Sequence, residues 1–141
     1  MVIEMQTDLV KNLFIESIPE NIALVEQFVE EIAEEYSIGE DIFGNMLISV
    51  TEAANNAMYH GNHCDVKKKV EISCIFLDAK NTLVYTIKDQ GKGFNFNNIP
   101  DPTAPENIGK ASGRGVFLMR QLADMFSFSN DGNTVELHFK L

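Results

Sequence analysis

Three short polar segments carry the side chains that could do chemistry in this sequence. In the first, Glu52, Asn56 and His60 follow one another at steps of four, and Gly61 and Asn62 come next. Steps of four place side chains on one face of a helix. A carboxylate and an amide oxygen one turn apart can orient a nucleophile and ligate a hard cation such as Mg²⁺. The alternative interpretation is an ordinary solvated helix face.

The second segment, Asp89-Gln90-Gly91-Lys92-Gly93-Phe94, follows a strand-like run. Asp89 continues the alternation of Leu83, Tyr85 and Ile87, which predicts a carboxylate at the edge of the buried face. A carboxylate in that place needs hydrogen-bond donors. The glycines after it allow the backbone to turn and to approach a ligand closely. An aspartate in an ordinary β-turn is the alternative.

The third segment is Ser112-Gly113-Arg114-Gly115, directly before a predicted helix. Free backbone N–H groups at a helix N-terminus favour an anion, and Arg114 can add a charge-assisted contact to a phosphate. A plain loop-to-helix junction is the alternative. The spacing does not fit a Walker A phosphate loop.

The elements that must position these segments can be read from the spacing of apolar residues. Turn-forming residues separate the segments, and Pro100, Pro102 and Pro105 fall in a long loop of about 20 residues. The predicted order is a strand at 9–18, helices at 22–36 and 40–60, strands at 70–77 and 83–88, the loop, a helix at 116–125, and a hairpin that turns at 130–133. The predicted fold is α/β, a two-layer sandwich in which helices cover one face of a mostly antiparallel mixed sheet.

Length and charge narrow the function classes. The 141 residues fit a single domain, 1–141, and the net charge of −10 argues against DNA or RNA as a direct ligand, although one local phosphate site is still allowed. Two cysteines, Cys64 and Cys74, are too few for a zinc cluster and are expected to be reduced thiols. The chain shows no membrane span and no signal-peptide pattern, so we expect a cytoplasmic protein.

Taken together, the three segments resemble the Bergerat ATP-binding fold that gyrase, a heat-shock chaperone, histidine kinases and a mismatch-repair ATPase share. The string TEAANNAMYHGN and the compact single domain most resemble the bacterial anti-sigma-factor serine/threonine-protein kinases of this GHKL superfamily, over about residues 18–141. The resemblance implies ATP and Mg²⁺ as cofactors.

At the base end of the nucleotide, the resemblance implies that Asp89 accepts a hydrogen bond from the adenine amino group. Gly91 and Gly93 would shape that pocket. Thr134 aligns with a threonine that helps to form the base pocket in this fold. The family usually has glycine before that threonine, and this chain has Asn133.

At the phosphate end, the resemblance implies that Asn56 coordinates Mg²⁺ and that Glu52 is the catalytic base. Gly113, Arg114 and Gly115 would lie at the phosphates, and an ATP lid would span about residues 95–112.

The expected function is that of an anti-sigma factor and serine kinase. It would phosphorylate a serine on an anti-sigma-factor antagonist, hold a sigma factor in the other state, and form a homodimer. At 141 residues the chain lacks room for the phosphoacceptor domain of a histidine kinase or the transducer domain of gyrase. Two alternatives stay open: a nucleotide-gated binding module and a simple ATPase.

Overall fold

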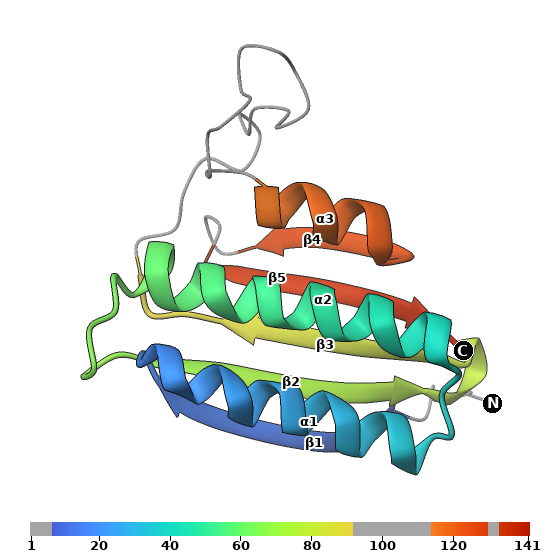
Figure 1. The fold of residues 1–141 in the computed structure, drawn as a ribbon. Helices are drawn as coiled ribbons and strands as arrows, with labels where there is room; N and C mark the ends of the chain where they lie inside the picture. The colour runs from blue at the N-terminus through green and yellow to red at the C-terminus, as the bar shows by residue number, and fades with distance from the viewer. Residues whose placement is uncertain (1–6, 92–113, 130–132) are drawn as a thin grey trace, which may run out of the picture.

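The computed structural model describes residues 7–91, 114–129 and 133–141. Within these ranges the chain forms two layers, a sheet and a set of helices that cover one of its faces (Figure 1). The strands are β1 (Thr7–Glu16), β2 (Lys69–Leu77), β3 (Thr82–Lys88), β4 (Met125–Ser129) and β5 (Thr134–Lys140). The helices are α1 (Ile22–Glu35), α2 (Glu40–Asn56) and α3 (Arg114–Leu122), with short helical turns at 19–21, 57–61 and 78–80.

The five described strands pair in the order β1-β2-β3-β5-β4, and every neighbouring pair is antiparallel. The predicted order of elements and the predicted two-layer architecture are confirmed. β3 lies at the centre of the sheet. Its C-terminal end therefore lies beside the N-terminal ends of β2 and β5, and residues that follow or precede these ends meet at one edge.

The core fills the space between the sheet and the helices. Cys74, Tyr85 and Leu137 lie side by side on three neighbouring strands, and all three side chains are buried. The Tyr85 ring packs edge-on against Phe28 of α1, with ring centroids 6.3 Å apart, and against Phe139 of β5 at 5.9 Å. Such edge-to-face pairs stabilise a core beyond their buried area. The sheet is thus held to α1 by aromatic packing in its centre.

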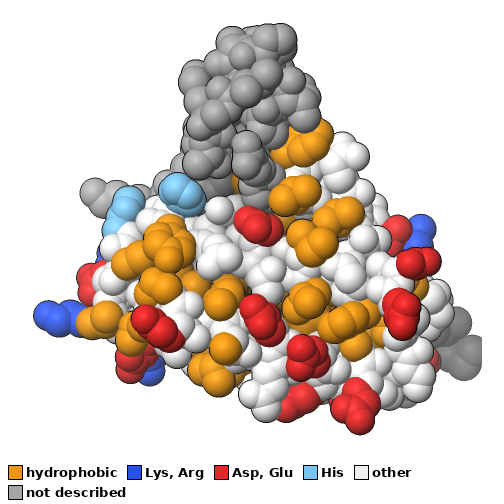
Figure 2. Space-filling view, viewed as in Figure 1, with side chains coloured by type: hydrophobic (Ala, Val, Ile, Leu, Met, Phe, Trp, Pro, Cys, Tyr) orange, Lys and Arg blue, Asp and Glu red, His pale blue; other side chains and the backbone are white. Residues whose placement is uncertain are grey.

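Most of the acidic residues along α1 lie on its solvated face. Val25, Phe28, Val29 and Ile32 are buried, while Glu26, Glu30, Glu34 and Glu35 are exposed. This is the periodicity of an amphipathic helix on a sheet. In the space-filling view, acidic side chains are spread over the helical face, with hydrophobic side chains between them (Figure 2).

The boundary between α3 and β4 corrects one prediction. The helix predicted to run to Met125 ends at Leu122, and Met125 is the first residue of β4 with 63% of its surface exposed. The backbone N–H of Asp124 donates to the His138 carbonyl (2.9 Å), and the Asp124 carboxylate accepts from the Lys140 N–H (2.8 Å). Pairing with β5 therefore ends the helix earlier than the apolar spacing indicates. At the other end of the sheet, β1 stops at Glu16, before the predicted Ile18.

Two further sequence predictions concern the cysteines and the membrane. Both cysteines are free thiols, half-buried at Cys64 and buried at Cys74. Among the described residues, none of the helices has the length and apolar character that crossing a lipid bilayer requires.

Candidate nucleotide site

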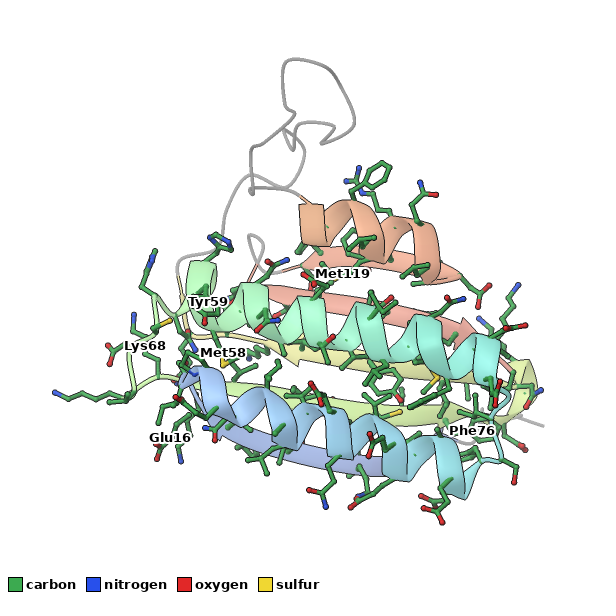
Figure 3. All side chains as sticks on the ribbon, in the orientation of Figure 1. Glu16, Met58, Tyr59, Lys68, Phe76 and Met119 are labelled. Carbon is green, nitrogen blue, oxygen red and sulfur yellow. The ribbon has the colours of Figure 1, made fainter. Side chains whose placement is uncertain are left out.

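Four elements bring polar residues to the same end of the sheet. Asp89 follows β3, Thr134 begins β5, Asn56 ends α2, and Arg114 begins α3. Because β3 is antiparallel to β2 and β5, residues 88–89 lie next to the start of both neighbours. Lys68 and Glu16 lie at this end as well, and Phe76 lies at the opposite end (Figure 3). The described residues of the three segments that sequence analysis singled out thus lie toward one end of the fold.

Asp89 is the buried carboxylate of this end. Only 7% of its surface is exposed, as its place in the β3 alternation predicts. Its backbone N–H donates to the Asn133 carbonyl (2.9 Å), and its Oδ1 accepts the Gly91 N–H (2.8 Å). Burial raises the pKa of this carboxyl, while the Gly91 N–H and the charge of Lys68 offset part of that rise. The carboxylate is therefore held at the edge of the core, where the Gly91 N–H donates to it.

Two glycines make this arrangement possible. A Cβ on Gly61 would lie 2.3 Å from the Asp89 carboxyl carbon, and a Cβ on Gly91 would lie 2.1 Å from the Gly61 carbonyl oxygen. Neither position admits a side chain, because the backbone of residue 61 and the turn after β3 are in direct contact. The sequence predicted that Gly91 shapes the pocket. It gave Gly61 no role in the pocket beyond its place after His60 in the first segment, and the structure adds contact with Asp89.

The C-terminal end of α2 carries the other predicted chemistry. Glu52 and Asn56 are half-buried, one turn apart, on the part of α2 that leads into the site. The helix then widens into a π-helical turn over Ala57–Gly61, which the Asn62 N–H closes by donating to the Ala57 carbonyl (2.8 Å). Such turns occur often at functional sites. This wider turn places Gly61 in contact with Asp89, and it leaves the His60 side chain exposed.

Thr134 begins β5 and pairs with Lys88, the residue before Asp89. Thr134 is buried, and its hydroxyl donates to the Asn133 side-chain oxygen (3.0 Å). The asparagine that replaces the family's usual glycine is therefore in direct contact with the predicted pocket residue. The Asn133 carbonyl also accepts the Asp89 N–H, so the start of β5 and the end of β3 are joined at this point.

Asn62 is the residue whose importance sequence reasoning missed. Its side chain has no exposed surface, and its amide bonds to three strand ends. Nδ2 donates to the Ser17 hydroxyl (3.0 Å) and the Lys69 carbonyl (3.1 Å), and Oδ1 accepts the Gln90 N–H (2.8 Å). No local sequence pattern predicts these long-range contacts. The one signal was a polar residue directly after the helix-ending Gly61.

Comparison with protein-family models matches residues 15–139 to the histidine kinase-like ATPase domain. This chain belongs to the histidine kinase-like ATPase family. The matched range runs from β1 into β5 and includes every segment of the candidate site. The fold and the family that the sequence motifs predicted are both confirmed.

Among curated proteins, this ATPase domain is similar to the serine-protein kinases RsbW of Bacillus cereus strain AH820 and of Bacillus anthracis. Each is 28% identical over 123 residues, which cover 82% of this chain and 75% of the relative. Among solved structures, it is similar to the RsbU and RsbW domains of a Mycobacterium tuberculosis protein, with a TM-score of 0.66 and 14% identity. That match covers 94% of this chain and 33% of the other, and it shows the shared fold. The resemblance to anti-sigma-factor kinases therefore rests on the sequence similarity to the serine-protein kinases RsbW.

The described donors of this ATPase domain are compatible with a magnesium ion that a bound nucleotide brings with it. Among the described residues, no group of three or more His, Cys, Asp and Glu side chains could hold a metal ion. Mg²⁺ needs only one or two protein oxygens when phosphates and water complete its shell. The Asn56 side-chain amide has an oxygen of this kind, and Asn56 is the predicted magnesium ligand.

Parts of the predicted base pocket and of the predicted phosphate end lie outside the described residues. This applies to Gly93, to Gly113 and to the predicted lid at 95–112. For Arg114 and Gly115 the structure describes the backbone, which begins α3.

Proposed function

We propose that this protein binds Mg-ATP and transfers the γ-phosphate to a serine of an anti-sigma-factor antagonist, and that it acts as an anti-sigma factor. The observation that carries the proposal is the buried Asp89 carboxylate, held by Gly61 and Gly91 at the end of the sheet where α2 and α3 also meet. Membership of the ATPase family and the similarity to serine-protein kinases RsbW support the same function.

The proposed roles divide the site into two halves. Asp89 accepts a hydrogen bond from the adenine amino group, and Gly91 and Thr134 border the base together with Gly93. Asn56 holds the magnesium ion, which neutralises phosphate charge when bound. Glu52 accepts the proton of the attacking serine hydroxyl. Gly113, Arg114 and Gly115 contact the phosphates from the start of α3.

Glu52→Ala tests the catalytic half. The variant should keep ATP affinity, because Glu52 does not touch the base, and should slow phosphoryl transfer by about 10²–10⁴-fold. Single-turnover transfer from γ-labelled ATP to a purified antagonist protein of the RsbW system measures the rate. Glu34→Ala on the exposed face of α1 is the matched control and should transfer at the wild-type rate. An unchanged rate in Glu52→Ala would remove this residue from catalysis.

The same assay separates the rival functions. Label on a serine supports a kinase, label released only as inorganic phosphate supports a simple ATPase, and bound ATP without turnover supports a nucleotide-gated binding module. The intact Glu52 favours an enzyme over the binding module, because a protein that only binds nucleotide has no use for a base.

We also propose that the protein forms a homodimer. The support is a row of four apolar side chains and one histidine on the sheet face opposite the helices, set by the strand register and exposed at its two ends. The row consists of Leu9, Ile75, Val84, His138 and Met125. Sedimentation velocity measures the state directly.

A further inference from the structure

The amide of Asn62 closes a ring of hydrogen bonds beneath the Asp89 turn. It bonds to Ser17 after β1, to Lys69 at the start of β2 and to Gln90 after β3. Two more bonds complete the ring: the Ser17 hydroxyl donates to the Lys68 carbonyl (2.6 Å), and the Lys69 N–H donates to the Gln90 side-chain oxygen (2.7 Å). Three strand ends that are far apart in sequence are thus tied to one buried side chain.

One hydrogen bond connects this ring to the candidate nucleotide site. Gln90 stands between Asp89 and Gly91, and its backbone N–H is held by the Asn62 Oδ1. The residue before Gln90 carries the Asp89 carboxylate, and the residue after it is Gly91. The Gly91 N–H donates a hydrogen bond to that carboxylate. Gly61, next to Asn62 in the chain, touches both residues. The direction of the Asp89 carboxylate therefore depends on where Asn62 fixes the turn.

We propose that Asn62 is a positioning residue that sets adenine specificity by fixing the Asp89-Gln90-Gly91 turn. This inference rests on the proposed function, because it assigns Asn62 a part in base recognition by Asp89. A site that hydrogen-bonds a particular edge of its ligand discriminates strongly against a ligand that lacks that edge. Discrimination of this kind requires the acceptor to be held in place, and the Asn62 amide is the group that holds it.

Asn62→Asp and Asn62→Leu separate positioning from stability. Both variants lose the amide donors to Ser17 and Lys69. Asn62→Asp keeps an oxygen that can accept the Gln90 N–H, whereas Asn62→Leu has none. Both should melt at a lower temperature than the wild type. Calorimetric titration with ATP and GTP should show that Asn62→Leu loses at least about tenfold of the preference for ATP, and that Asn62→Asp keeps most of it.

Two controls probe the same end of the sheet without touching Gln90. Ser17→Ala removes a member of the ring and leaves the bond between Asn62 and Gln90 intact. Asn21→Leu removes an amide that donates to the Glu16 carbonyl at the end of β1. Both should lower stability and preserve the ATP preference. An Asn62→Leu variant that is destabilised but keeps the wild-type preference would overturn the inference. If that variant does not fold, Asn62→Ser takes its place, because its side chain is too short to reach the Gln90 N–H.

Failure of the proposed function gives a different result. If the wild type binds neither nucleotide, the proposed function fails, and amide hydrogen exchange then decides whether Asn62 positions the turn. Protection of the Gln90 and Gly91 amides in the wild type and in Asn62→Asp, with rapid exchange in Asn62→Leu, supports positioning. Equal protection in all three proteins overturns it.

Discussion

Asp89 shows at the scale of one residue how a binding site can cost stability. Because burial raises the pKa of this carboxyl in the folded protein, the fold binds a proton at Asp89 more readily than the unfolded chain does. Its contribution to the free energy of unfolding is therefore greatest at low pH and is lost as the pH rises through the raised pKa. Above the raised pKa the ionised group opposes folding, and we interpret Asp89 as a residue kept for its proposed ligand.

Asp89→Asn should weaken ATP binding and spare the fold. A hydrogen bond to a charged group contributes about 1.5–3 kcal/mol, which corresponds to roughly ten- to hundredfold in affinity. The asparagine oxygen can still accept the Gly91 N–H, and the buried charge is gone, so the melting temperature should stay equal or rise. Calorimetric titration and thermal unfolding measure the two effects. Unchanged ATP affinity would exclude Asp89 from the base site.

The same carboxylate should make ATP binding of the wild type depend on pH. Protonation removes the negative charge that strengthens the hydrogen bond from the adenine amino group, so ATP affinity should fall on acidification through the Asp89 pKa, which lies above that of an ordinary aspartate. ATP binding by Asp89→Asn supplies the control, because titration of the phosphates affects both proteins equally. Identical pH profiles would contradict the assignment.

At the scale of elements, Gly44 within α2 and Gly91 in the turn after β3 should respond to alanine in opposite directions. A Cβ on Gly44, inside α2, would meet no atom within 4 Å, whereas a Cβ on Gly91 would collide with the Gly61 backbone. Gly44→Ala should raise the free energy of unfolding by about 0.5–1 kcal/mol through helix propensity alone. Gly91→Ala should separate the π-helical turn from the Asp89 turn, and lower both stability and ATP affinity.

Urea unfolding and ATP titration of the two variants test this contrast. ATP affinity should be unchanged in Gly44→Ala, since that glycine is far along α2 from the site. Wild-type ATP affinity in Gly91→Ala would show that close contact between residues 61 and 91 is not needed for binding.

Sequence predicted those features of the elements that depend on local pattern. The alternation through Leu83, Tyr85 and Ile87 located Asp89 at the core edge, and the spacing of four placed Glu52 and Asn56 on one helix. Contacts between distant segments were not predictable in this way. Met125 was assigned to a helix because its spacing fits one, yet pairing of β4 with β5 decides its structure. Asn62 bonds to residues 17, 69 and 90, and no local signal encodes such a set.

At the scale of the whole molecule, one continuous core joins the sheet to the helices, and Cys74 lies inside it. The thiol is buried at the centre of β2, next to Tyr85 of β3. Burial raises its pKa to about 12, the charge of Glu35 adds to the rise, and the neighbouring Tyr85 hydroxyl offsets part of it. A thiol must ionise and be accessible to react. Cys64, by contrast, is half-buried in the segment after α2 and outside this core.

Thiol labelling should therefore report the integrity of the whole fold. In the native protein a disulfide reagent such as DTNB should modify Cys64 quickly and leave Cys74 unmodified, and complete unfolding should expose both thiols. In Cys64→Ser the remaining Cys74 should react at a rate that follows global unfolding, rising with urea in proportion to the unfolded population. Because the same core positions α2 and β3, a Cys74 rate that ignores urea would show that the two layers open locally. The end of the sheet that holds Asp89 and Asn62 would then lack the rigid support that base recognition requires.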